Sequence, residues 1–417
     1  MVSSRIVQLA QQIISNTHEL DSYLQSENLP SPSFEEDGPV DFGIRSDSIK
    51  KAQDVVIDST LELHNLLIGP ALCLRPVLNG VSLQAIYKYN IASHVPMRGQ
   101  ISFEDLASKC GLDPINLRRI LRFAMAHHYV FQEPRSGYVA HSAASRKLSE
   151  DSNAQATLGY MFDEVWQAFA HTLQAKEKFK SDEPNESGWS LSQHTDRPVW
   201  EHYASHPEMA KRFARTMSAL AEGGNSPLFL VEGFSWPSVG DGSGIVVDVG
   251  GSKGDVSIAI AQSTSNLQFV VQDLPSMIKD AKTHVPNEVT NRIHFMAHDF
   301  FKDQTVQADV YLFRRIFHNW SDSHVVRILR ATVPALKPGS RLVINDYLIP
   351  NAGEMSPSKE RDIRSMDMIM LSLFNSRERD ANDWRMIILD ADVRFQDIKI
   401  WTPDGASLAI IEATWKN

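Results

Sequence analysis

The stretch Ile245-Val246-Val247-Asp248-Val249-Gly250-Gly251-Ser252-Lys253-Gly254 decides the fold of this 417-residue chain. Its apolar, β-branched run predicts a buried strand, and the glycines that follow predict a tight turn where backbone can approach a ligand closely. This order is typical of the first strand and the nucleotide-binding loop of a doubly wound α/β domain. We expect Asp248, Gly250 and Gly254 to shape that loop.

Two further apolar runs end in acids, where a bound nucleoside would need them. The run 267–271 leads into Asp273, at roughly the 20-residue separation from the glycines at which a carboxylate binds both ribose hydroxyls. The run beginning at Ile293 ends in Asp299 and Phe300, which we expect to flank an adenine. Three strand ends thus converge on one nucleoside. The alternative is an ordinary strand with a tight turn and two solvated acids.

The loop chemistry narrows the choice of cofactor. No Gly-x-x-x-x-Gly-Lys-Ser/Thr motif is present, so the phosphate cradle of an ATPase is missing. Ser252 stands where a dinucleotide fingerprint has its second glycine, and its side chain would crowd a pyrophosphate. S-adenosyl-L-methionine (SAM) has no phosphates and tolerates a serine there. We therefore expect SAM, or S-adenosyl-L-homocysteine (SAH) as its product.

Composition excludes several other classes of protein. The net charge is −10 and no basic stripe is present, which argues against nucleic acid as a partner. The two cysteines, Cys73 and Cys110, cannot form a disulfide framework, so we expect a reducing, cytoplasmic setting. No signal peptide is evident, and no apolar run reaches the roughly 18 residues that a membrane span needs.

The N-terminal half has helical periodicity. Apolar residues recur at helical spacing over the first 25 residues and predict one amphipathic helix, followed by a polar, proline-containing stretch at 26–38 that we interpret as a mobile linker. A capping-box start at 102–105, a turn at 111–114 and a hairpin at 129–139 predict a winged helix. DNA binding is the alternative use of this module, but the chain is acidic.

Taken together, the motifs identify a family. They are Asp-Val-Gly-Gly-Ser-x-Gly (248–254), Val-Gln-Asp-Leu-Pro (271–275), His298-Asp299-Phe300, Arg-Ile-Phe-His-Asn-Trp-Ser-Asp (315–322), Glu378-Arg379-Asp380 and Asp383-Trp384. Over nearly its whole length the chain resembles the SAM-dependent small-molecule O-methyltransferases of plant and fungal secondary metabolism, and the fungal branch in particular. The resemblance implies a Rossmann-like, doubly wound class I methyltransferase domain with an N-terminal all-helical and winged-helix dimerisation domain.

The resemblance also sets the expected domain limits and partners. We expect an N-terminal helix and mobile linker at 1–45, a helical dimerisation and winged-helix domain at 46–150, a helical linker that contributes to the acceptor pocket at 151–204, and the SAM-binding catalytic domain at 205–417. The protein would be a homodimer that acts on a small hydrophobic or aromatic molecule, without nucleic acid or membrane.

Methyl transfer to oxygen needs proximity, a dry site and a base for the hydroxyl proton. Histidine accepts a proton near neutral pH, and the resemblance implies that His318 is this base, with Asp346 and Asp383 at the positions where the family has two orienting glutamates. It also implies cofactor contacts from Gly251, Leu274 and Arg315.

Two apolar stripes are candidates for the acceptor pocket or, equally, for plain core. Phe162, Trp166 and Phe169 share one helix face, and Met366, Met370 and Phe374 lie at intervals of four. Thioether side chains adapt to flat, irregular ligands. His141 is a further candidate contact, although a structural histidine on the wing is the alternative.

Other activities stay open at this point. Some fungal proteins that resemble these methyltransferases retain SAM as a bound cation and catalyse pericyclic or dehydration steps, for which His141, Arg315 and His318 would be hydrogen-bond donors. A catalytically silent scaffold of the same fold is a third possibility. We expect no metal, because no zinc spacing is present and Asp309 is the only acid near the fourth strand before His318.

Overall fold

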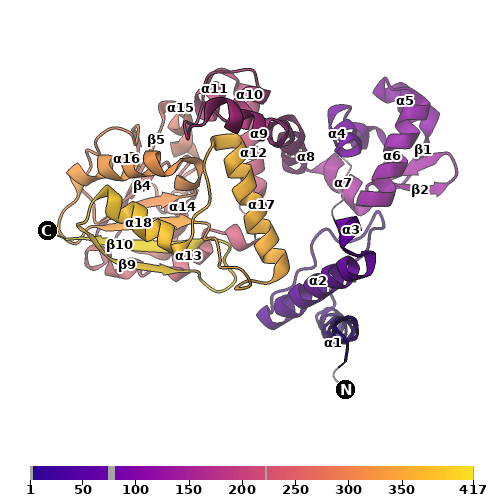
Figure 1. Cartoon of the computed structure of the whole chain (residues 1–417), viewed down its shortest axis with the longest axis horizontal. Coiled ribbons are helices and arrows are strands. Elements are labelled where there is room, and N and C mark those ends of the chain that lie inside the picture. Colours follow the sequence, from indigo (N-terminus) through magenta and orange to yellow (C-terminus); the bar gives the residue numbers. More distant parts are fainter. Residues whose placement is uncertain (1–2, 74–79, 221–222, 417) are drawn as a thin grey trace. The chain divides into compact units, whose positions relative to one another are not determined.

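The computed structural model describes residues 3–73, 80–220 and 223–416, and these divide into two compact units (Figure 1). The N-terminal unit comprises Met1–Asp163, Lys211–Ala219 and Ser356–Lys359, and the C-terminal unit comprises Glu164–Ala210, Leu220–Met355 and Glu360–Asn417. Within these described residues, none of the helices combines the length and the apolar character needed to cross a membrane.

The N-terminal unit is mainly helical. Its helices are α1 (Arg5–Ser26), α2 (Asp47–Ile68), α3 (Pro70–Cys73), α4 (Val81–Lys88), the 3-10 turn η1 (Ile91–His94), α5 (Phe103–Cys110), α6 (Pro114–His128), α7 (Ala143–Glu150) and α8 (Ser152–Tyr160). The amphipathic helix that the sequence predicts is α1, which packs against α2 and buries Leu9 and Leu24.

A winged helix forms the second half of this unit. The strands β1 (Gln100–Ser102), β2 (Gln132–Arg135) and β3 (Tyr138–Ala140) make an antiparallel sheet in the order β1-β3-β2. The Ser102 hydroxyl accepts a hydrogen bond from the Asp105 amide at 3.0 Å and so caps α5, as the sequence predicts. Phe103, Leu117 and Leu121 are fully buried in the core that the helices share with the sheet.

The segment between α1 and α2 has no helix or strand, yet it is anchored to the winged helix. The rings of Phe34 and Tyr129 stack with their centroids 4.2 Å apart. The backbone carbonyl of Phe34 accepts hydrogen bonds from the Ala143 amide and from the Gln132 side chain. Arg146 donates to the carbonyl of Gly38 at 3.0 Å. These contacts hold the stretch that the sequence suggests is a mobile linker.

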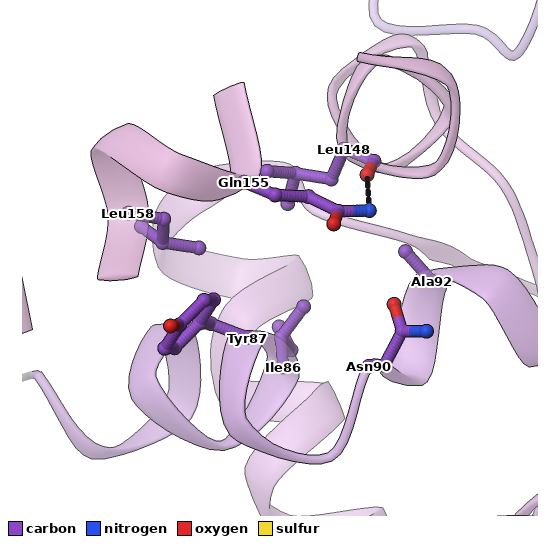
Figure 2. A pocket seen from close by; sticks show the side chains of 7 residues that line it. All are labelled: Ile86, Tyr87, Asn90, Ala92, Leu148, Gln155 and Leu158. Carbon is purple, nitrogen blue, oxygen red and sulfur yellow. Dashed lines mark hydrogen bonds between the residues drawn. The ribbon is translucent and has the colours of Figure 1, made fainter. Parts of the chain in front are cut away.

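The described part of this unit contains cavities, among them the following two. One of about 650 Å³ lies between the anchored segment and helices α4, α7 and α8, with a mostly apolar lining that includes Phe34 and Met161. The other, shown in Figure 2, measures about 10 Å³, which is room for about one water. There Gln155 donates a hydrogen bond to the Leu148 carbonyl at 2.7 Å. Neither cavity is lined by residues that the sequence assigns to catalysis.

In the part of the chain that the structure describes, the remaining elements are helices, helical turns and seven strands that form one sheet. The helical elements are the π-helical turn η2 (Met161–Val165), α9 (Trp166–Phe179), α10 (Gly188–Ser192), α11 (Val199–Ser205), α12 (Pro207–Ala219), η3 (Gly223–Asn225), α13 (Leu228–Gly233), η4 (Trp236–Gly242), α14 (Asp255–Ser263), α15 (Pro275–Ile278), η5 (Ala281–His284), η6 (Phe317–Asn319), α16 (Asp322–Thr332), η7 (Val333–Ala335), α17 (Pro357–Phe374) and α18 (Ala381–Ala391). The strands are β4 (Ile245–Val249), β5 (Gln268–Asp273), β6 (Ile293–Ala297), β7 (Val310–Arg314), β8 (Arg341–Asp346), β9 (Phe395–Trp401) and β10 (Ala409–Trp415).

The sheet is doubly wound, which confirms the predicted fold class. Within the described residues its strand order is β6-β5-β4-β7-β8-β10-β9, and the order reverses direction between β4 and β7. Alternate side chains of the strands face two apolar cores. One core packs Val247 and Phe313 against α16 and α18, and the other packs Val246 and Leu312 against α13 and α14. Ligands bind such sheets at the switch point, beyond the carboxyl ends of the strands.

One edge of the sheet departs from the expected parallel arrangement. β10 runs antiparallel to both β8 and β9. Only residues 402–408 join β9 to β10, and a parallel crossover needs about a dozen residues or more. The short connection therefore requires a hairpin, while β4 to β8 stay parallel.

Candidate active site

The glycine loop is a tight turn in which Gly250 and Gly251 leave no room for a Cβ atom. Gly250 and Gly254 have φ of +74° and +81°, in the left-handed region, and the Gly250 and Gly251 amides both donate to the Gln272 carbonyl. A Cβ atom added to Gly251 would lie 2.6 Å from the Asp248 carboxyl carbon. The loop thus keeps β4 close to β5 and leads directly into α14.

Asp248 supports this loop from inside. Its side chain is buried and accepts a hydrogen bond from the Ser257 hydroxyl on α14 at 2.7 Å. Burial raises the pKa of Asp248 to about 6, and the Ser257 bond opposes that shift. Asp248 therefore joins the end of β4 to the first turns of α14.

The other predicted cofactor residues follow β5 and β6 at the same edge. Asp273 accepts hydrogen bonds from the Ser252 amide at 2.9 Å and from the Leu274 amide at 2.7 Å. Leu274 is 44% exposed, and Asp299 is exposed with its carboxylate on the Phe301 amide. Phe300 packs edge-on against Trp320 at 5.8 Å. A carboxylate, an apolar side chain and the glycine loop thus share this edge.

His318 lies in η6, directly after β7, and is buried. Its Nδ1 lies 2.9 Å from Oε1 of Glu378 and 3.9 Å from Oδ1 of Asp346. A neutral imidazole that donates from Nδ1 keeps its lone pair on Nε2. The hydrogen bond to Glu378 therefore makes Nε2 the nitrogen that can accept a proton.

Asp346 ends β8 as a fully buried side chain. Within the described residues neither of its carboxylate oxygens has a hydrogen-bond partner. Burial raises the pKa of Asp346 to about 6, and His318 only partly opposes this shift. For His318, burial by itself lowers the pKa. The negative charges of Asp346 and Glu378 outweigh this effect, so the net shift of the His318 pKa is upward. Both groups are thus displaced toward their proton-bound forms.

Glu378, and not Asp383, contacts the imidazole. Asp383 forms a salt bridge with Arg377 at 2.7 Å and accepts a hydrogen bond from the Asp380 amide, while Asp380 caps α18. Asp383 is therefore the N3 residue of a capping box and is committed to the start of its own helix. On this geometry Glu378 lies against the imidazole where Asp383 was expected. The Asp-x-x-Asp pattern at 380–383 is the sequence signal that identifies the cap.

Arg315 follows β7 and lies three residues before His318. It has a left-handed φ of +53°, and its amide donates to the Asn345 carbonyl at 3.0 Å. Its positive charge lowers the pKa of both His318 and Asp346, and this effect is smaller than those of burial and of the neighbouring acids and histidine. Arg315 therefore acts electrostatically on His318 and Asp346.

The candidate pocket residues are in varied environments. Met370 and Phe374 are buried on α17, and Phe374 stacks on Trp200 at 5.4 Å, whereas Trp166 is 40% exposed. The remaining candidates are Phe162, which is buried, Phe169, which is 40% exposed, and Met366, which packs against Tyr347, Ile363 and Leu408.

His141 has a structural environment inside the N-terminal unit. Its Nδ1 lies 3.0 Å from the Ser145 hydroxyl and its Nε2 lies 3.1 Å from the Val95 carbonyl. The ring is 1% exposed. Both nitrogens are therefore engaged within the fold, which favours the structural interpretation of this residue.

Comparison with known proteins supports the assignment of the family. A family profile described as an O-methyltransferase domain matches residues 189–394. The O-methyltransferase pyvH of Aspergillus violaceofuscus is 49% identical and covers 100% of both chains, and the grayanic acid biosynthesis cluster O-methyltransferase of Cladonia grayi is 48% identical over 99% of this chain and 88% of its own. The crystal structure of OxaC in complex with SAH and oxaline has a TM-score of 0.75, at 19% identity over 98% of this chain and 100% of that one. The chain therefore belongs to the SAM-dependent O-methyltransferase family.

Proposed function

We propose that the protein transfers the methyl group of SAM to a hydroxyl of a small polyketide- or alkaloid-type secondary metabolite, with His318 as general base. The observation that carries this proposal is the buried His318–Glu378 hydrogen bond of 2.9 Å at the carboxyl edge of the sheet. The same edge carries the glycine loop, so the base and a SAM-type cofactor would share one site.

The residues at this edge fit a nucleoside cofactor. The glycine loop has no Cβ atom at Gly250, Gly251 and Gly254, and we propose that Asp273 binds the ribose while Leu274, Asp299 and Phe300 contact the adenine. When bound, SAM supplies a methyl group already activated by its sulfonium. The protein then has to hold the acceptor in line, exclude water and remove one proton.

His318 meets the requirements for that proton transfer. Nε2 accepts the hydroxyl proton, and the resulting imidazolium is stabilised by Glu378 on Nδ1 and by the charge of Asp346 3.9 Å away. The Nδ1 hydrogen bond also fixes the ring orientation and the tautomer. This is the role that a carboxylate plays behind a catalytic histidine in hydrolases.

The first experiment tests the reaction itself. Purified protein is incubated with methyl-labelled SAM and an extract of its native producer, and products are analysed by mass spectrometry. We expect labelled methyl to appear in a small molecule and to disappear with His318→Ala. His294→Ala, at an exposed position on β6, is the control and should retain activity. A substrate that changes without gaining mass would instead establish the pericyclic or dehydration chemistry with retained SAM.

The second experiment tests the ribose contact. Asp273→Ala should weaken SAM binding by about 1–3 kcal/mol, the scale of a lost hydrogen bond to a charged group. Titration calorimetry measures this loss directly. Asp280→Ala, at an exposed position shortly after α15, should bind SAM as the wild type does. Equal affinities for the two variants would contradict the role of Asp273.

The third experiment uses pH to test the partner of the base. Glu378 raises the pKa of His318 through its charge and its hydrogen bond, so Glu378→Gln should lower that pKa. Because the neutral imidazole is the active form, the acid limb of the turnover profile should move to lower pH. The plateau rate should fall as well, since the ring loses its orientation. Asp383→Asn is the matched control, and a profile that shifts with Asp383→Asn instead would refute the assignment.

We further propose that the protein is a homodimer whose contact includes α1 and α2. These two helices pair with each other but leave apolar side chains exposed, namely Ile6, Val7, Ile14, Ile57, Leu66 and Leu67. Exposed apolar patches of this kind mark protein interfaces. Light scattering should give the mass of two 46.8 kDa chains, and Leu67→Asp should lower it toward one. A wild type that runs as a single chain at all concentrations would refute this.

A further inference from the structure

Arg379 is a buried guanidinium that joins two distant loops. It is 0% exposed, and its Nη1 and Nη2 donate to the carbonyls of Phe317 at 3.0 Å and Trp320 at 2.7 Å. These carbonyls flank the short turn that holds His318. Arg379 itself follows Glu378 directly in the chain. One side chain therefore spans from the segment of the base to the segment of its carboxylate partner.

The charge of Arg379 is balanced within the same network. Its Nε donates to Oδ1 of Asp322 at 2.9 Å, at the first residue of α16, and its guanidinium lies over the Trp384 ring at 5.3 Å. A buried charge without such a partner costs several kcal/mol. A planar fork can reach two carbonyls and a carboxylate together, which an ammonium group cannot do in this geometry.

Further bonds leave the Glu378 segment little freedom. The Glu378 amide donates to Asp367 on α17 at 2.8 Å, and the Ser376 hydroxyl donates to the carbonyl of His318. Arg379 adds the contacts on the far side of Glu378. Glu378 is thereby held through its own amide and through its neighbour Arg379. Ser376 and Arg379 both hold the turn that carries His318.

We propose that Arg379 is a positioning residue that sets the contact between His318 and Glu378. It touches no reacting atom and acts only through the two loops. The role deepens the proposed function, because a base needs its orienting carboxylate within a few tenths of an ångström. A displacement of the Glu378 segment would break the 2.9 Å hydrogen bond while leaving the glycine loop intact.

Arg377 provides a matched control on the same acid. It pairs with Asp322 and Asp383 through a side chain that is 43% exposed. Its side-chain hydrogen bonds go to these two carboxylates rather than to the carbonyls that flank His318. Arg377→Lys therefore perturbs Asp322 and the start of α18 without removing the clamp on the histidine turn.

The test is a titration of the His318 ring by NMR in protein with labelled histidine, assigned by difference from His318→Ala. The charged or ionisable groups that face the ring are Glu378, Asp346, Arg315 and Tyr347. Arg379→Lys should shift the His318 midpoint to lower pH, as Glu378→Gln does, because the carboxylate moves away. Arg377→Lys should leave the midpoint unchanged. SAH affinity by calorimetry should be within about twofold of the wild type in all variants, since none of these residues lies at the glycine loop.

The double variant Glu378→Gln/Arg379→Lys decides between coupling and independent effects. If Arg379 acts through Glu378, the double variant should titrate like Glu378→Gln alone. Additive shifts, or an unchanged midpoint in Arg379→Lys, would overturn the inference. If Arg379→Lys does not fold, Asp322→Asn removes the charge partner of the clamp and should give the same shift; a wild-type midpoint in folded Asp322→Asn would also overturn it.

This readout is separate from methyl transfer. Failure of the proposed function would show as a wild type that labels no small molecule, or as labelled product that persists in His318→Ala, whatever the ring titration does. Failure of the positioning role would show in the titration while His318→Ala still abolishes product.

Discussion

The parallel run of β6, β5, β4, β7 and β8 is the constraint on which the site depends. Strands that run in one direction release their chains at one edge, so the segments after all of them meet there. The glycine loop, Asp273, Asp299, His318 and Asp346 each lie at or just after the end of a different one of these strands. Residues spread along a hundred positions of sequence become neighbours without any long-range feature in the sequence having to specify it.

The burial of the ionisable side chains around His318 has an electrostatic consequence. His318, Asp346 and Glu378 are all nearly without solvent exposure, so each carries a desolvation cost that the others have to offset. The offset is incomplete at Asp346, whose oxygens lack hydrogen-bond partners among the described residues. The arrangement raises the pKa values of His318 and Asp346, which makes His318 a stronger base.

Much of this could be predicted from the sequence, and the failures have local causes. The strand and glycine pattern at 245–254 and the position of His318 follow from short stretches whose neighbours are fixed by the fold. Glu378 and Asp383 could not be told apart by spacing, because the decision depends on where α18 begins and on Asp380 as its cap. The limits of the N-terminal unit could not be predicted either, because two later segments of the chain belong to it. In these segments Arg212 forms a salt bridge with Asp163, and Lys359 forms one with Asp54.

The anchored segment between α1 and α2 matters for the way these chains diverge. Phe34 and Tyr129 are almost a hundred positions apart, yet each forms the stacking surface of the other, and Phe34 also lines the 650 Å³ cavity. A substitution at either ring therefore changes the lining of the cavity and also the contact that anchors the segment between α1 and α2. The two positions should therefore substitute as a pair among relatives, and a chimera that exchanges N-terminal segments has to carry both halves of the stack.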